Sequence, residues 1–133
     1  MTDWLKKLSP SGKPEELTPL QLAWLGDAIW EVHQRLLLCS KPARLRDIHS
    51  SVVLKVKAEA QAHALQKLDC NLTDEEKQLV KRGRNRVGRG SRKIDAAIYA
   101  KATGFETLVG WLFLKNPKRL AQILDFLETS SNC

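Results

Sequence analysis

The chain has 133 residues, 43% of them hydrophobic, which suits one domain with a buried core. Its net charge is +7, no apolar run approaches the roughly 20 residues of a membrane span, and the first residues lack a secretory-signal pattern. Three widely spaced cysteines, Cys39, Cys70 and Cys133, form no zinc pattern, and their odd number favours reduced thiols. We therefore expect a soluble protein of the cytoplasm.

The first predicted helix begins with a capping box. Thr18 can cap the helix, Pro19 stands at its first position, and Gln21 can return a hydrogen bond to Thr18. This helix should run to about Cys39. A second long helix should begin at residue 50 or 51 and end near Leu68. Its apolar positions at helical spacing are Val53, Val56, Ala60, Ala64 and Leu68.

A shorter helix and a basic segment come next. Thr73 and Glu76 have the spacing of a second capping box, which predicts a helix to about Lys81. A basic, glycine-containing loop should follow, to about Lys93. Residues 81–93 hold seven positive side chains and no acid, whereas the rest of the chain is close to neutral. A local positive block of this kind favours a polyanionic partner, most often nucleic acid.

The last part of the chain predicts two more helices. Residues 94–114 read as a helix that bends or restarts near Thr103 and Gly104, and Asn116 and Pro117 predict the start of the final helix. Little of the sequence is typical of strands, and no repeat or linker suggests a second domain. We predict an all-α protein, a bundle of about five to seven helices.

Gly26 and Asp27 are unusual near the middle of a helix. Glycine there lowers helix stability by about 1 kcal/mol relative to alanine. Where it is found, it usually allows another backbone or a ligand to approach closely. Asp27 has no base one turn away, because Ala23, Trp24, Trp30 and Glu31 occupy those positions. The acid is therefore either an ordinary surface residue or one that needs a partner from elsewhere, for which a metal ion is one candidate.

Glu106 is the second acid of interest. It is the only acid between Asp95 and Asp125, and an apolar run follows it. Thr103 and Glu106 also have capping-box spacing, so Glu106 either caps a restarted helix or binds a metal, and the pattern does not favour one over the other.

Four blocks of sequence resemble the catalytic domain of the ribonuclease III family. They are "LAWLGDAIWE", "VKAEAQAHAL", "KRGRN" and "ATGFETLVGWLFL", in family order, and they are most similar to Mini-ribonuclease III, the small subgroup without a separate double-stranded RNA-binding domain. The resemblance runs from about residue 18 to residue 127. It implies a ribonuclease III-type endonuclease domain over residues 18–133 and an N-terminal extension over residues 1–17.

The resemblance also implies roles for particular residues. Asp27 and Glu106 match the acids that bind catalytic Mg²⁺, and Trp24 matches an aromatic residue that packs into the partner of a homodimer; a place in the bundle core is the alternative for Trp24. The basic segment matches the one offered to RNA, and its candidate RNA-binding residues are Lys81, Arg82, Arg84, Asn85, Arg86, Arg89, Arg92 and Lys93.

The pattern departs from the larger enzymes of the family at three positions. Leu20, Ala23 and Thr103 stand where those enzymes carry further acids, so one Mg²⁺ held by two carboxylates is expected. Glu31 could bind a water, orient a basic residue from another helix or face solvent.

The function implied is an Mg²⁺-dependent endoribonuclease that cleaves double-stranded RNA, in maturation of the large-subunit (23S) ribosomal RNA precursor. Two alternatives stay open at this point. One is a non-catalytic RNA-binding or ribosome-assembly module on the same fold, and the other is a helical DNA-binding protein.

Overall fold

The structure is a computed structural model, which describes residues 13–39, 54–86 and 93–129. These residues form five α-helices and two 3-10 helices, and none of them lies in a strand. The elements in chain order are η1 (Pro14–Glu16), α2 (Pro19–Cys39), α4 (Leu54–Leu68), η2 (Asp69–Asn71), α5 (Asp74–Asn85), α6 (Lys93–Lys115) and α7 (Pro117–Thr129). The prediction of an all-α bundle is confirmed.

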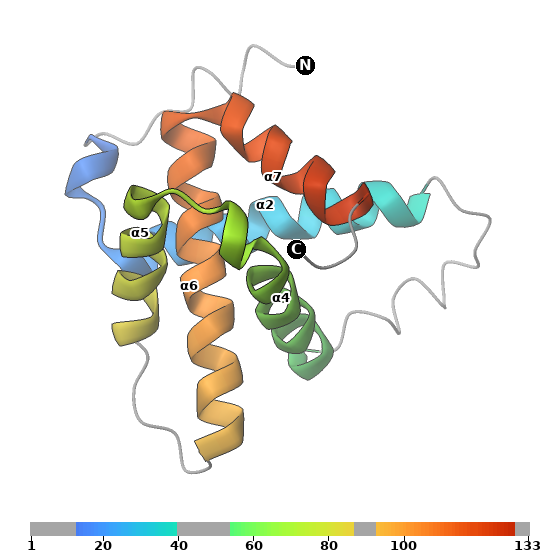
Figure 1. Ribbon diagram of the computed structural model, residues 1–133, viewed down its shortest axis with the longest axis horizontal. Helices are drawn as coiled ribbons and strands as arrows, with labels where there is room; N and C mark the ends of the chain where they lie inside the picture. The colour runs from blue at the N-terminus through green and yellow to red at the C-terminus, as the bar shows by residue number, and fades with distance from the viewer. Residues whose placement is uncertain (1–12, 40–53, 87–92, 130–133) are drawn as a thin grey trace.

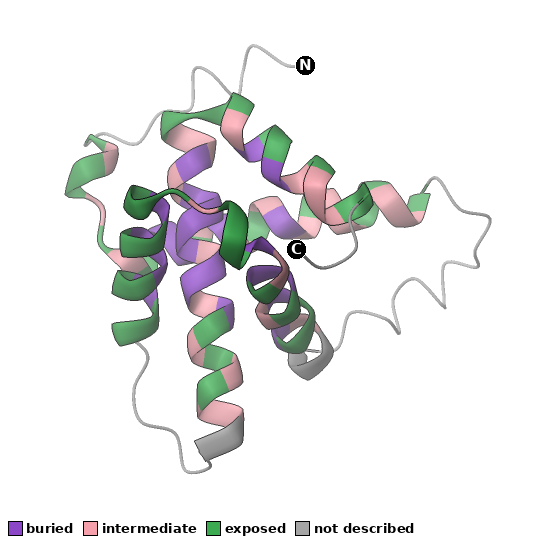
Figure 2. Ribbon diagram, viewed as in Figure 1, coloured by how far each residue is buried: buried purple, intermediate pink, exposed green. Residues whose placement is uncertain are grey.

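Helix α6 is the central element of the bundle. Figure 1 shows α4 and α5 on its two sides, α2 crossing it and α7 lying over its C-terminal end, and α6 contacts all four of these helices. The buried residues gather where α6 meets the other helices, whereas its first turns are mostly exposed or half-buried (Figure 2). Almost any side chain on the second half of α6 is therefore packed against another helix.

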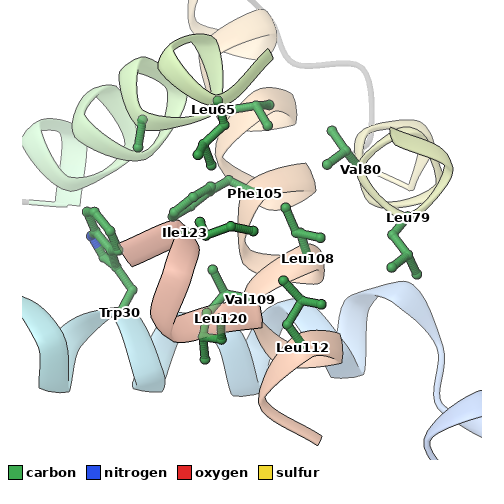
Figure 3. Packing of buried hydrophobic residues seen from close by; sticks show 12 residues of the cluster. Trp30, Leu65, Leu79, Val80, Phe105, Leu108, Val109, Leu112, Leu120 and Ile123 are labelled. Atoms are coloured by element: carbon green, nitrogen blue, oxygen red, sulfur yellow. The ribbon is translucent and has the colours of Figure 1, made fainter. Parts of the chain in front are cut away.

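The hydrophobic core forms around Phe105 of α6, which is fully buried. Its ring meets Trp30 of α2 edge-on, with the ring centroids 5.1 Å apart. Figure 3 shows Leu65 of α4 and Ile123 of α7 beside the same ring. Four helices thus share one core, so a change at the centre of α6 reaches all of them.

Local capping signals define three helix starts. Thr18 N–H donates to Gln21 Oε1 (2.9 Å) and Gln21 N–H donates to Thr18 Oγ1 (3.1 Å), as a capping box requires. Thr73 and Glu76 make the same reciprocal pair before α5. Asn116 Oδ1 accepts from the Arg119 N–H at 3.2 Å and caps α7. These three predictions from the sequence are confirmed.

A charged pair fastens α7 to the start of α5. Arg119 donates from Nε and from a terminal nitrogen to the two oxygens of Glu76, each at 2.8 Å, and also to the Asn71 carbonyl at 2.7 Å. Bidentate pairs of this kind fix both distance and orientation. The hydrogen bond from Arg119 is the main reason that the pKa of Glu76 lies below its usual value.

Several sequence predictions were wrong in detail. Helix α5 continues to Asn85, so the first part of the predicted basic loop is helical. Helix α6 neither ends nor restarts at Thr103 and Gly104. On α4, Ala64 and Leu68 are buried as predicted, but Ala60 is exposed and Gln61 is buried instead; the side chains of Val53 and Val56 lie outside the described part.

The cysteine prediction was also wrong in one place. Cys39 is a free thiol, as expected, but Cys70 is disulfide-bonded. Among the described residues, no helix has the length and apolar character to cross a bilayer.

Candidate active site

The site is built where α2 crosses α6, with glycine on both helices. A Cβ at Gly26 would lie 2.7 Å from the carbonyl carbon of Glu106 and 2.9 Å from the amide nitrogen of Gly110. A Cβ at Gly110 would lie 2.8 Å from the carbonyl carbon of Leu22. All three distances are shorter than a Cβ tolerates, so only glycine allows the two backbones to approach this closely. The approach places Asp27 beside Glu106.

Asp27 is partly buried and meets a cation from another helix. Lys57 of α4 places Nζ 2.6 Å from Asp27 Oδ1. This is a close ion pair without hydrogen-bond geometry, because the enclosed Oδ1 has no hydrogen-bond donor. Burial pulls the pKa of Lys57 down, but the two acids it contacts, Asp27 and Glu31, outweigh burial and raise that pKa above its ordinary value. The ammonium is therefore charged at neutral pH.

Glu106 is a strongly perturbed carboxyl group in the interior of α6. Burial, and then the hydrogen bond and negative charge of Asp27, raise its pKa to about 8. Two opposing effects are smaller: Gln61 Nε2 donates to Glu106 Oε2 at 3.3 Å, and Lys57 contributes positive charge. Without a metal, Glu106 is therefore mostly protonated at neutral pH, as the more buried of two closely placed acids often is. The capping interpretation of Glu106 is wrong, because no helix starts there.

Glu31 lies one turn after Asp27 and is held by two bases. Lys57 Nζ donates to its Oε1 at 3.2 Å, and Arg35 Nε donates to its Oε2, also at 3.2 Å. Of the roles that the sequence left open, orientation of a basic residue from another helix is therefore the one that the structure favours.

The donor set fits a hard divalent cation such as Mg²⁺. Asp27 has an enclosed oxygen in contact with the Lys57 ammonium, and Glu106 beside it carries a proton that a divalent cation would replace. Mg²⁺ keeps several waters and is commonly held by only one or two carboxylates. Within the described ranges no cluster of three or more His, Cys, Asp or Glu residues could hold a metal.

The basic segment lies at the end of α5 and the start of α6. Lys81, Arg82, Arg84 and Asn85 are exposed on the last turns of α5, and Arg86 follows, also exposed. Between them Gly83 is buried against Thr107 and Gly104 of α6, which fixes this end of α5 to the helix that carries Glu106. Arg89 and Arg92 lie outside the described residues, as does the side chain of Lys93.

Trp24 is 81% exposed, so the alternative of a place in the bundle core is wrong. It belongs to a set of apolar residues spaced by four along α2, all of them exposed. We call this set the apolar stripe; its members are Leu20, Trp24, Ala28, Val32 and Leu36. A connected apolar surface on one helix is typical of a contact with another protein surface.

Two residues of the site were missed by sequence reasoning, Lys57 and Gln61. They lie one turn apart on α4, and they contact Asp27 and Glu106 respectively. Their spacing of four residues puts them on one face of the helix, but the sequence does not show which face is buried. In the structure Gln61 is only 1% exposed.

Comparison with known proteins agrees with this geometry. The profile of the Ribonuclease III domain matches residues 20–117. The chain is 41% identical to Mini-ribonuclease 3 from a Synechocystis species, with 94% of this chain and 89% of the relative covered. It is 45% identical to Mini-ribonuclease 3 from a Synechococcus species (94% and 90% covered) and 43% identical to that of Symbiobacterium thermophilum (86% and 94%).

A solved structure has the same fold. The crystal structure of a protein from Fusobacterium nucleatum superimposes with a TM-score of 0.76 at 27% identity, covering 90% of this chain and 100% of that one. The chain belongs to the ribonuclease III domain family, and within it to the Mini-ribonuclease 3 group. It is therefore an endoribonuclease, an enzyme that hydrolyses phosphodiester bonds within RNA.

Proposed function

We propose that this endoribonuclease cleaves double-stranded RNA with Mg²⁺ held by Asp27 and Glu106. The single observation that supports the proposal is the convergence of these two acids at a glycine-lined crossing, where Asp27 has an enclosed oxygen and the pKa of Glu106 is raised to about 8. Burying two acids together is costly, and a divalent cation is the partner that compensates for it.

In the proposed reaction the cation would activate water and neutralise charge, and the side chains would bind and orient the cation. Mg²⁺ bound there would lower the pKa of water and neutralise charge on the phosphate. Asp27 and Glu106 would supply its protein ligands, and Gln61 would orient Glu106 through the hydrogen bond to Oε2. Glu31 is not a ligand in this scheme, because both its oxygens already accept from Lys57 and Arg35.

The exposed basic residues at the end of α5 are the proposed RNA contact. Proteins hold duplex RNA mainly by its phosphates, 2′-hydroxyls and shape, which suits exposed arginines more than aromatic residues. Arg82 and Arg84 are exposed on the helix fixed to α6 through Gly83, and Arg86 is exposed directly after that helix. We propose the same role for the remaining candidates, Lys81, Asn85, Arg89, Arg92 and Lys93.

A homodimer would provide two catalytic centres for the two strands of a duplex. Closed two-fold pairs are the commonest oligomers, and each copy would cut one strand. The apolar stripe with Trp24 at its most exposed point is the proposed interface.

We also propose a biological setting and a domain division. The substrate is the precursor of the large-subunit (23S) ribosomal RNA, processed in the cytoplasm. Residues 18–133 form the catalytic domain, and residues 1–17 form an extension whose last part, η1, is attached through the ion pair between Glu15 and Lys115.

The test is cleavage of a duplex RNA by the native protein and by Asp27→Asn, each with Mg²⁺ and with EDTA. The native protein should cut only with Mg²⁺, and Asp27→Asn should lose at least about a hundredfold in rate because the metal loses a charged ligand. Lys77→Gln, an exposed change on α5, is the matched control and should cut normally.

Other results would overturn the proposal. Equal cutting in EDTA, or full activity of Asp27→Asn, would exclude the metal mechanism. Tight duplex RNA binding with no cleavage in Mg²⁺ or Mn²⁺ would indicate the non-catalytic binding module instead. A preference for duplex DNA in competition would favour the DNA-binding alternative.

A further inference from the structure

Lys57 brings a positive charge into direct contact with a proposed metal ligand. Its side chain is only 18% exposed, and Nζ lies 2.6 Å from Asp27 Oδ1 and 3.2 Å from Glu31 Oε1. Three acids, Asp27, Glu31 and Glu106, would otherwise face one another without a cation between them. The positive charge of Lys57 offsets part of the repulsion that acids placed this closely would otherwise exert on one another.

The two contacts of Lys57 are not equivalent. The contact with Glu31 is a hydrogen bond, whereas the shorter contact with Asp27 lacks hydrogen-bond geometry and leaves Asp27 Oδ1 without a donor. The ammonium is therefore held by both acids, closer to Asp27 and with hydrogen-bond geometry to Glu31. Glu31 is itself held in place by Arg35 through its other oxygen.

We propose that Lys57 is a resident cation of the site, anchored by Glu31, which a divalent metal must displace from Asp27 in order to bind. This inference rests on the proposed metal site. It makes Lys57 and Glu31 positioning residues that set the metal affinity without contacting the metal. It also explains how the two catalytic acids stay together in the metal-free protein.

The inference predicts that a substitution beside the active site raises the affinity for the metal, whereas such substitutions usually lower it. Lys57→Met removes a cation that competes with the metal, so Mn²⁺ alone, without RNA, should bind about five to ten times more tightly than to the native protein. Lys57→Arg keeps the charge and should bind Mn²⁺ about as the native protein does. Lys67→Met is the control, since it removes a charge from the same helix about 15 Å further along and should leave the affinity unchanged.

Glu31 should act mainly through Lys57. In the native background, Glu31→Gln removes one of the two acids that pair with the Lys57 ammonium. The ammonium then pairs with Asp27 alone and competes more strongly with the metal, so Mn²⁺ should bind about three times more weakly. In the Lys57→Met background most of this loss should disappear. A direct attraction between Glu31 and the metal would instead give the same loss in both backgrounds, and that result would overturn the role given to Glu31.

The experiment is isothermal titration of Mn²⁺ into the full chain and each variant, with unfolding curves recorded in parallel. Weaker Mn²⁺ binding by Lys57→Met would contradict the inference, because it would mean that Lys57 supports the ligands and does not compete with the metal. Unchanged binding would contradict it too. Asp27→Asn distinguishes a failure of the proposed metal site from a failure of the role given to Lys57. If this variant binds Mn²⁺ as the native protein does, or if neither protein binds Mn²⁺, the metal site itself is wrong.

Discussion

Replacement of Gly26 by alanine tests the helix crossing on which the site depends. In an ordinary helix this change gains about 1 kcal/mol of stability, because alanine has the higher helix propensity. Here the new Cβ would lie 2.7 Å from the Glu106 carbonyl carbon and 2.9 Å from the Gly110 nitrogen, whereas carbon contacts prefer roughly 3.5–4.0 Å. Both atoms belong to the backbone of α6, so no side chain can rotate away.

The helices must therefore separate by about 1 Å. Overpacking of this kind typically costs 1–3 kcal/mol, so after the propensity gain we expect a net loss of about 1–2 kcal/mol in the free energy of unfolding. The effect on cleavage should be larger. A displacement of about 1 Å between Asp27 and Glu106 is enough to lower the rate about a hundredfold.

Urea unfolding and duplex RNA cleavage would be measured on Gly26→Ala and on Ala121→Gly. Ala121 is exposed on α7, so its change alters only propensity and should cost about 1 kcal/mol with full cleavage. If Gly26→Ala is more stable than the native protein by about 1 kcal/mol and cleaves at the native rate, the crossing is not tight and the reasoning fails.

Three further predictions concern other parts of the molecule. The lowered pKa of Glu76 means that its charge stabilises the fold above about pH 4.5. In urea unfolding, the difference in free energy of unfolding between the native protein and Glu76→Gln should be constant from about pH 5 to 7 and shrink at lower pH. A difference that does not depend on pH would contradict this. Trp24→Ser should convert dimer to monomer in sedimentation at micromolar concentration, without loss of fold, and an unchanged mass would exclude the proposed interface. Arg82→Gln should weaken duplex RNA binding and reduce the salt dependence of log K by about one unit, so an unaltered slope would remove Arg82 from the contact.

Local signals in the sequence were enough to predict most helix starts. The capping pairs of Thr18 and Thr73 involve residues three positions apart, so their geometry is set by the neighbouring chain. The glycines were harder to interpret. Gly104 was read as a break, yet its missing Cβ makes room for the Val80 carbonyl oxygen, which such a Cβ would approach at 2.8 Å. A glycine needed for packing and a glycine that ends a helix look the same in one sequence.

The candidate site could be predicted only in part. The unusual surroundings of Asp27 indicated a partner from another helix, and the structure places both Glu106 and Lys57 there. Lys57 could not have been predicted, because its contact depends on the rotation of α4 about its own axis. The apolar pattern placed Ala64 and Leu68 correctly on the buried face, but it put Ala60 there in place of Gln61.

The position of a bound metal is the most direct measure of the account as a whole. We predict that crystals soaked in Mn²⁺ give one strong anomalous peak between the carboxylates of Asp27 and Glu106, with the Lys57 ammonium withdrawn from Asp27 towards Glu31. A peak elsewhere, or no peak at a concentration of Mn²⁺ that supports cleavage, would contradict it.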